Sequence, residues 1–133
     1  AEAAFRTCVE LDPGYLDGWN NLGIVRAQIG DDSGADEAWK EALLRDQKYC
    51  KAHNNLGLLA SRKGEWSRAI SEFQAAVRDC PDNPIAHYGL GSIYYGPRRD
   101  RKRAILHYQI LLEISPAFDR AEEARERLLE LTW

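Results

Sequence analysis

The sequence predicts an all-α protein in which antiparallel helix hairpins stack into an α-solenoid. The first observation is a period of 34 residues, because a Leu-Gly pair at Leu22 returns at Leu56 and again at Leu90. The second is that apolar residues within each period follow the i, i+3, i+4, i+7 spacing of a helix. Alternation with period two is nowhere sustained, so strands are not expected. One hairpin cannot bury its apolar stripe alone, whereas stacked hairpins share a continuous core.

Eight helices are expected, separated by turn residues. They are predicted near 1–11, 16–29, 33–46, 50–63, 66–79, 84–95, 101–114 and 119–131. Gly-containing runs at 30–34 and 63–65 separate the two helices of a pair. Asn83 is predicted as the N-cap of a helix that begins at Pro84. The residue before Pro116 avoids the helical conformation, so a helix ends there.

The single domain 1–133 divides into units of one hairpin each. We expect a leading half-repeat at 1–15, full repeats at 16–49, 50–83 and 84–118, and a capping helix at 119–133. In the third full repeat, Ala104 and Tyr108 stand one place later than the period requires, so one residue is inserted between Gly96 and Arg103. Insertions are best tolerated in turns, so this stretch is predicted to be a turn. The last helix has one apolar stripe and charged residues elsewhere, which is typical of the cap that a solenoid end needs.

Small and aromatic residues recur at matching positions and are expected to form the core. Three glycines let facing helices approach closely, and three aromatic residues fill the space between successive hairpins. The glycines are Gly23, Gly57 and Gly91, and the aromatic residues are Trp39, Phe73 and Tyr108. The matching positions of the half-repeat are Ala1, Phe5, Cys8 and Pro13. His53 and His87 take the place of Trp19 in the later units, so they are predicted to pack between helices.

These recurring positions together resemble the tetratricopeptide repeat (TPR) over nearly the whole chain. The resemblance is specific because three copies agree in several places. His53 and His87 depart from the family's early Trp. Arg26 and Ala60 replace its usual aromatic residue, and none of these departures shifts the register. The resemblance implies a right-handed TPR superhelix whose concave surface is lined by the first helix of each pair.

The resemblance also implies that this concave groove binds a peptide or a partner segment, so a non-catalytic protein–protein interaction scaffold is expected. The groove-facing positions are Asp17, Asn20, Asn21, Ile24, Lys51, Asn54, Asn55, Leu58, Tyr88, Ser92 and Tyr95, and the final helix adds Arg120 and Glu123. Asn21 and Asn55 are the most informative, because Asn is a poor helix former and its amide can pair with any peptide backbone. Some family members use an Asn here as a ladder, which Gly89 would shorten in this chain. The alternative is that these asparagines are only polar surface residues of the repeat and bind no ligand.

The charge balance gives no general attraction to nucleic acid or to anionic lipid. Lys and Arg total 18 and Asp and Glu 21, a formal net charge of -3. No apolar run approaches the roughly 20 residues that span a bilayer, so no membrane insertion is expected. The stretch 98–103 is the one basic cluster, and it could meet an acidic partner or nucleic acid, or be a solvated turn. A protein or peptide is the expected partner, and nucleic acid is not.

Catalysis, metal binding and cofactors are not expected. No phosphate loop or dinucleotide fingerprint is present. His53 and His87 occupy equivalent places in adjacent repeats, whose helices sit about 8–10 Å apart, too far to converge on one metal ion. His107 has no Cys or Ser partner at a spacing typical of a catalytic site. No catalytic residue, metal site or cofactor is therefore assigned.

The three cysteines are Cys8, Cys50 and Cys80, and they lack the spacing of a metal site. Reduced, partly buried thiols in a reducing compartment are expected, and with them a cytoplasmic location. A disulfide between Cys50 and Cys80 is the alternative, because both lie at the same end of one hairpin. The chain begins in mid-pattern, contains no Met and shows no signal peptide, so it is expected to be a piece of a longer protein.

Two alternatives to a peptide-binding scaffold stay open. The array could be an oligomerisation module that stacks end to end through an exposed apolar end, which implies self-association. It could also be a regulatory domain of a larger enzyme. Fold alone does not decide between these functions.

Overall fold

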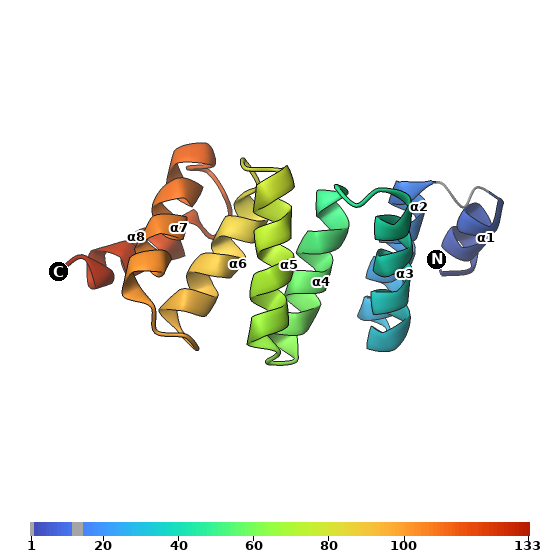
Figure 1. The fold of residues 1–133 in the computed structure, drawn as a ribbon, viewed down its shortest axis with the longest axis horizontal. Coiled ribbons are helices and arrows are strands. Elements are labelled where there is room, and N and C mark those ends of the chain that lie inside the picture. The colour runs from blue at the N-terminus through green and yellow to red at the C-terminus, as the bar shows by residue number, and fades with distance from the viewer. Residues whose placement is uncertain (1, 12–14) are drawn as a thin grey trace.

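The computed structural model describes residues 2–11 and 15–133 and contains eight helices in that part of the chain. The helices are α1 (Glu2–Leu11), α2 (Leu16–Gln28), α3 (Asp32–Arg45), α4 (Cys50–Arg62), α5 (Trp66–Asp79), α6 (Pro84–Tyr95), α7 (Arg101–Ile114) and α8 (Ala121–Leu131). They form one row with the termini at opposite ends (Figure 1). The described residues contain no strand. The predicted helices are confirmed, each with ends within two residues of those expected, and so is the all-α solenoid.

Consecutive helices pack as antiparallel hairpins. The pairs α2–α3, α4–α5 and α6–α7 have the most extensive contacts. Each hairpin packs against the next through α3–α4 and α5–α6 (Figure 1). The first helices also touch one another, through α2–α4 and α4–α6. The first helices are therefore the inner layer of the row, and their common face is the concave surface.

Side chains at the helix starts explain where the helices begin. Asn83 Oδ1 accepts the backbone N–H of Ala86 at 3.4 Å, which makes Asn83 the predicted N-cap before Pro84. Asp31 caps α3 and Asp100 caps α7 in the same way, at 2.9 and 3.1 Å from the backbone nitrogens three residues on. These caps satisfy N–H groups that the helices leave without a partner.

The inserted residue of the third repeat lies in the α6–α7 turn, as predicted. In the first two hairpin turns, Gly30 and Gly64 adopt left-handed backbone with φ of 86° and 74°. The N–H of the next residue then reaches back five residues, as in the bond from Glu65 to the Ala60 carbonyl. In the α6–α7 turn the matching residue is Arg99, with φ of 49°, and the N–H of Asp100 reaches back six residues to Tyr94. The extra residue therefore lies between Tyr94 and Arg99.

The repeated positions form the core. Leu22, Leu56 and Leu90 are at most 1% exposed, as the period requires. Phe73 is fully buried and meets the glycines of two repeats, since a Cβ added at Gly57 or at Gly89 would lie 2.7 or 2.6 Å from its ring. Real Cβ atoms do not approach that closely, so both positions need glycine. One aromatic ring thus joins the second and third repeats.

The histidines at the Trp19 position connect the two helices of their hairpins. His87 is 5% exposed, and its Nε2 lies 2.9 Å from the Pro81 carbonyl oxygen. That oxygen only accepts, so His87 donates through Nε2, and its Nδ1 lies 3.1 Å from His107 Nδ1. Burial, followed by the charges of His87 and Arg103, lowers the pKa of His107 to about 4, which favours the neutral form of His107.

The expectation of reduced thiols is wrong for two cysteines. Cys50 and Cys80 form a disulfide between the start of α4 and the end of α5, with 6.4 Å between their Cα atoms. The helices of one hairpin run antiparallel, so its first and last residues meet at the same end. The side chains of Phe5 and Cys8, and residues Ala1 and Pro13, lie outside the described part.

Candidate functional site

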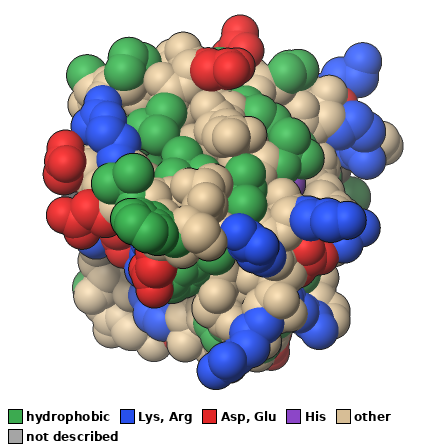
Figure 2. Space-filling view, turned by 90° about the vertical axis from the view of Figure 1, so that its left-hand side faces the viewer, with side chains coloured by type: hydrophobic (Ala, Val, Ile, Leu, Met, Phe, Trp, Pro, Cys, Tyr) green, Lys and Arg blue, Asp and Glu red, His purple; other side chains and the backbone are tan. Residues whose placement is uncertain are grey.

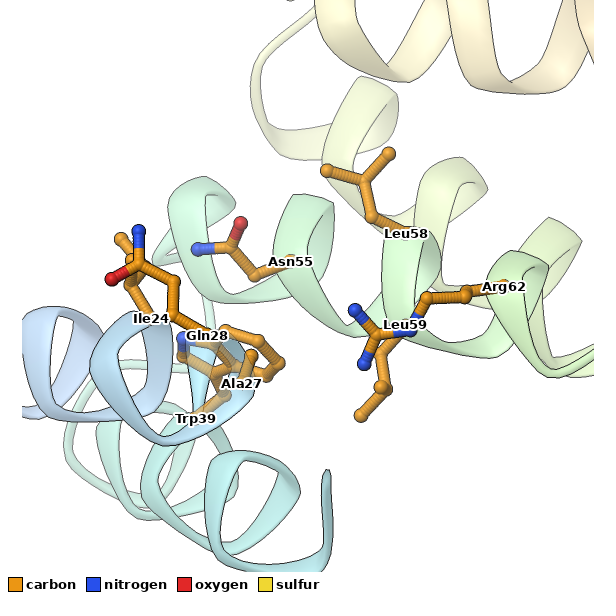
Figure 3. Close-up of a pocket in the computed structure, with 8 residues that line it drawn as sticks. All are labelled: Ile24, Ala27, Gln28, Trp39, Asn55, Leu58, Leu59 and Arg62. Atoms are coloured by element: carbon orange, nitrogen blue, oxygen red, sulfur yellow. The ribbon is translucent and has the colours of Figure 1, made fainter. Parts of the chain in front are cut away.

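The concave surface holds an apolar cavity between the first two full repeats. It has a volume of about 220 Å³. Its lining residues are Ile24, Ala27 and Gln28 from α2, Trp39 from α3, and Asn55, Leu58, Leu59 and Arg62 from α4 (Figure 3). Leu58 is 45% exposed, so part of its side chain is open to a ligand. The cavity combines apolar walls with an amide and a guanidinium at its rim, which suits a ligand with both apolar and polar groups.

A second cavity lies on the other side of Leu58, between the second and third full repeats. It has a volume of about 200 Å³. Its lining residues are Leu58, Ser61, Trp66, Phe73, Tyr88, Gly89, Ser92, Ile93 and Pro97. Gly89 has no side chain, which lets the Phe73 ring pack against its backbone beside this cavity. The two cavities are therefore neighbours that share one leucine.

The asparagines of the groove differ in how far the fold uses their amides. Asn55 Nδ2 donates to Asn20 Oδ1 at 2.7 Å, which joins α4 to α2 and leaves the Asn55 oxygen toward the groove. Asn21 is half-buried and makes no hydrogen bond within the described part of the chain. Asn54 is 8% exposed and exchanges two hydrogen bonds with Asn83, at 2.8 and 3.2 Å. The free amide groups are thus those of Asn21 and, in part, Asn55.

The predicted groove residues of the third repeat are tied to α8. Tyr88 donates its hydroxyl hydrogen bond to Glu123, and Tyr95 donates to Glu130, both at 2.6 Å. Burial and the Glu123 carboxylate raise the pKa of Tyr88, whereas the Glu130 carboxylate is the main cause that raises the pKa of Tyr95. Ser92 Oγ lies 3.3 Å from the Tyr108 hydroxyl. This part of the groove is therefore a closed polar network.

Asp17 and Lys51, two further predicted residues, form an ion pair at the opposite end of the helices. Asp17 accepts a hydrogen bond from the Tyr49 hydroxyl at 2.5 Å and lies 3.6 Å from Lys51 Nζ. The Tyr49 hydrogen bond, followed by the Lys51 charge, lowers the pKa of Asp17. Ile24 is half-buried and lines the first cavity. The structure thus brings Ile24, Asn55 and Leu58 together and places Asp17 and Lys51 apart from the cavities.

Several cavity residues do not appear among the predicted groove positions. Gln28 and Arg62 stand four residues after Ile24 and Leu58, which places them on the same helix face one turn further. Trp39 belongs to the second helix of its hairpin, and its Nε1 donates to the Asn20 carbonyl at 3.2 Å. The helical period could have found Gln28 and Arg62. Trp39 required knowledge of how far α3 tilts toward the groove.

Among the described residues, no group of three His, Cys, Asp or Glu side chains could hold a metal ion. None of the described helices is long and apolar enough to cross a bilayer.

Comparisons with known proteins agree with the repeat geometry. Residues 61–96 match the family model of the TPR repeat. A TPR repeat-containing protein of Pseudomonas aeruginosa is 50% identical over 36 residues, which are 27% of this chain. That match spans about a third of the relative's length, 34%.

Solved structures match almost the entire chain. YrrB, described as a TPR protein with an unusual peptide-binding site, is 21% identical with a TM-score of 0.86, covering 98% of this chain and 66% of YrrB. MamA is 23% identical with a TM-score of 0.77, covering 98% of this chain and 84% of MamA. A tetratricopeptide repeat protein from Parabacteroides merdae is 20% identical with a TM-score of 0.82. The match covers 99% of this chain and 52% of that protein. Residues 61–96 thus match a TPR repeat, and the stacked hairpins have the fold of solved TPR proteins.

Proposed function

We propose that this chain is a non-catalytic scaffold that binds an extended segment of a partner protein along α2, α4 and α6. The observation that carries the proposal is the pair of apolar cavities on either side of Leu58. Each is large enough for one apolar side chain. Neighbouring helices lie about 8–10 Å apart, which three residues of extended chain span at about 3.3 Å each. In the polyproline II conformation, which has three residues per turn, two apolar side chains three positions apart lie on one face and would reach both cavities.

The amide groups beside the first cavity favour an extended ligand over a helical one. An extended peptide exposes backbone N–H and C=O groups that need partners, whereas a helix satisfies its own. Asn55 offers its amide oxygen at the cavity, and Asn21 stands about one helical turn before Ile24, which lines it. YrrB, which has a similar fold, is described as having a peptide-binding site, and this supports the same class of ligand here.

The test is a selection of peptide ligands followed by affinity measurement. A phage-displayed library of random dodecapeptides is the probe, and a selected peptide is titrated by calorimetry. We expect Leu58→Glu to weaken binding more than tenfold, because it places a charge between the cavities. Asn21→Ala with Asn55→Ala should weaken it about tenfold through two lost hydrogen bonds.

The matched control is Leu44→Glu, since Leu44 is a leucine of α3 that is 77% exposed. It should leave both affinity and helicity unchanged. Equal losses of peptide affinity in Leu44→Glu and Leu58→Glu would show that the groove is not the site. Selected peptides whose affinity none of these substitutions changes would show the same.

Two further expectations from the sequence, the absence of catalytic activity and a cytoplasmic location, are part of this proposal. The TPR family and fold are typical of scaffolds without catalytic activity, which supports a binding role. The cytoplasmic location expected from the sequence stays a prediction. The Cys50–Cys80 disulfide favours an oxidising compartment instead.

A further inference from the structure

The α6–α7 turn concentrates positive charge that the fold does not neutralise. Five of the six residues from 98 to 103 are basic, and the only carboxylate among them, Asp100, pairs with Arg103 at 2.6 Å. The other four have no ion pair in the described part of the chain, and we call them the turn cluster. They are Arg98, Arg99, Arg101 and Lys102. The whole chain carries a net charge of -3, so this positive surface is a local exception.

The neighbours of the turn cluster are neutral groups. Arg98 Nη2 donates to the Ser67 hydroxyl at 2.7 Å, and Arg101 Nε donates to the Leu131 carbonyl at 2.5 Å. Arg99 and Lys102 make no side-chain hydrogen bond within the described residues. All four residues are exposed, and Arg98 lies beside α5. Their charges are thus available to a partner.

The stability of α7 does not explain these charges. Arg101, Lys102 and Arg103 form the first turn of α7, where unpaired N–H groups already carry a partial positive charge. Each cation there is unfavourable by about 0.3–1 kcal/mol at low salt. The first turns of α2, α3 and α8 contain acidic residues instead. Asp100 already caps the end of α7 through the Arg103 N–H, so a bound anion would meet the cations at the surface.

A cavity of about 460 Å³ opens beside the cluster. Its lining residues are Tyr94, Tyr95, Gly96, Arg99, Arg101, Glu130 and Leu131. Glu130 is the one carboxylate in it, and Tyr95 already donates to that carboxylate at 2.6 Å. At the C-terminal end of the molecule, Lys and Arg side chains gather along the lower and right-hand sides around an apolar patch (Figure 2). Charge and apolar surface therefore meet at this edge.

We propose that this edge is a docking surface for a short acidic segment of a protein partner, separate from the Leu58 groove. Two or more carboxylates of the segment lie against the turn cluster, and an adjacent apolar side chain enters the cavity. A nucleic acid fits less well, because Tyr94 is only 7% exposed and the Arg127 guanidinium covers the Tyr95 ring at 4.5 Å. Neither ring is open to stack on a base. The exposed carboxylates of α8, Glu122 and Glu126, would also repel a long polyanion.

The test is fluorescence anisotropy with a fluorescein-labelled synthetic peptide in which four Asp or Glu residues surround one Leu. A matched peptide carries Asn and Gln at those places. We expect only the acidic peptide to bind at low salt, with a dissociation constant that rises as NaCl is added. Arg99→Gln with Lys102→Gln should weaken it about threefold to tenfold, because two exposed charge pairs are lost.

The charge-matched control is Lys48→Gln with Arg78→Gln, at the opposite end of the helices. It should leave the dissociation constant unchanged, and far-UV circular dichroism should be the same for all variants. Equal binding of the Asn and Gln peptide, or an equal loss in the control pair, would overturn the proposal. So would tighter binding of an oligothymidylate that the Arg99 and Lys102 changes abolish. Leu58→Glu should not affect the acidic peptide, which separates this surface from the groove.

Discussion

Arg99 occupies the backbone position that glycine holds in the two preceding hairpin turns. Gly30 and Gly64 adopt positive φ there without cost, whereas a side chain in the left-handed region costs about 1–2 kcal/mol. The one-residue insertion before Arg99 lengthens the turn without relieving this conformation, since φ stays at 49°. A single residue of the turn cluster therefore combines an unpaired charge with an unfavourable backbone.

Arg99→Gly should stabilise the protein by up to about 1 kcal/mol. The gain is the removed left-handed penalty, less the greater entropy that glycine has in the unfolded chain. Urea unfolding followed by circular dichroism measures it. Gly64→Ala is the reciprocal control and should destabilise by about 1 kcal/mol. A loss of stability in Arg99→Gly would show that the Arg99 side chain contributes more than its backbone costs.

At the scale of the element, the α4–α5 hairpin is the most strongly braced of the three. The Cys50–Cys80 disulfide closes its open end, and the Asn54–Asn83 pair links α4 to the residue that caps α6 at the same end. His53 adds a contact of 2.9 Å to Glu72 of α5. The central hairpin is thus held by the disulfide and the His53–Glu72 contact, and it is tied to the start of α6.

Loss of the disulfide should lower the melting temperature by about 10 °C. A cross-link over a sequence separation of 30 restricts the unfolded chain by about 3–4 kcal/mol. Calorimetry with and without dithiothreitol measures the shift, and Cys50→Ser with Cys80→Ser should reproduce it. Dithiothreitol should have no further effect on that double variant. Identical melting temperatures of the oxidised and reduced wild type would show that the disulfide does not stabilise the fold.

The helices could be predicted from the sequence, but the contacts between them could only be predicted in part. Period, caps and turn glycines are local signals, so the bounds of α4, with Cys50 at its start, agreed closely with expectation. The Asn54–Asn83 pair depends on how α4 meets a turn 29 residues away, which no local pattern encodes. The same holds for Arg62, whose place in the cavity follows from how α4 stacks on α2. Asn54 looked like a ligand contact because its partner, Asn83, lies 29 residues away in the turn before α6.

At the scale of the whole molecule, stability depends on the contacts between repeats. Each hairpin touches only its neighbours along the row (Figure 1). Such arrays behave as units joined by nearest-neighbour interfaces, so one weak interface can divide them into separately unfolding parts. Among the described residues, Phe73 is the single ring that reaches the close-approach glycines of two repeats, Gly57 and Gly89.

Phe73→Ala should therefore do more than destabilise the core. Removal of a fully buried Phe costs about 3–5 kcal/mol, and here the loss falls on the interface between the second and third repeats. We expect the single urea transition of the wild type to divide into two, with circular dichroism and tryptophan fluorescence no longer coincident. Leu106→Ala is the control, since Leu106 is 50% exposed on α7, and its transition should stay single. A Phe73→Ala variant that still unfolds in one coincident transition would mean that cooperativity passes between repeats through other contacts, with the direct α4–α6 packing as the first place to look.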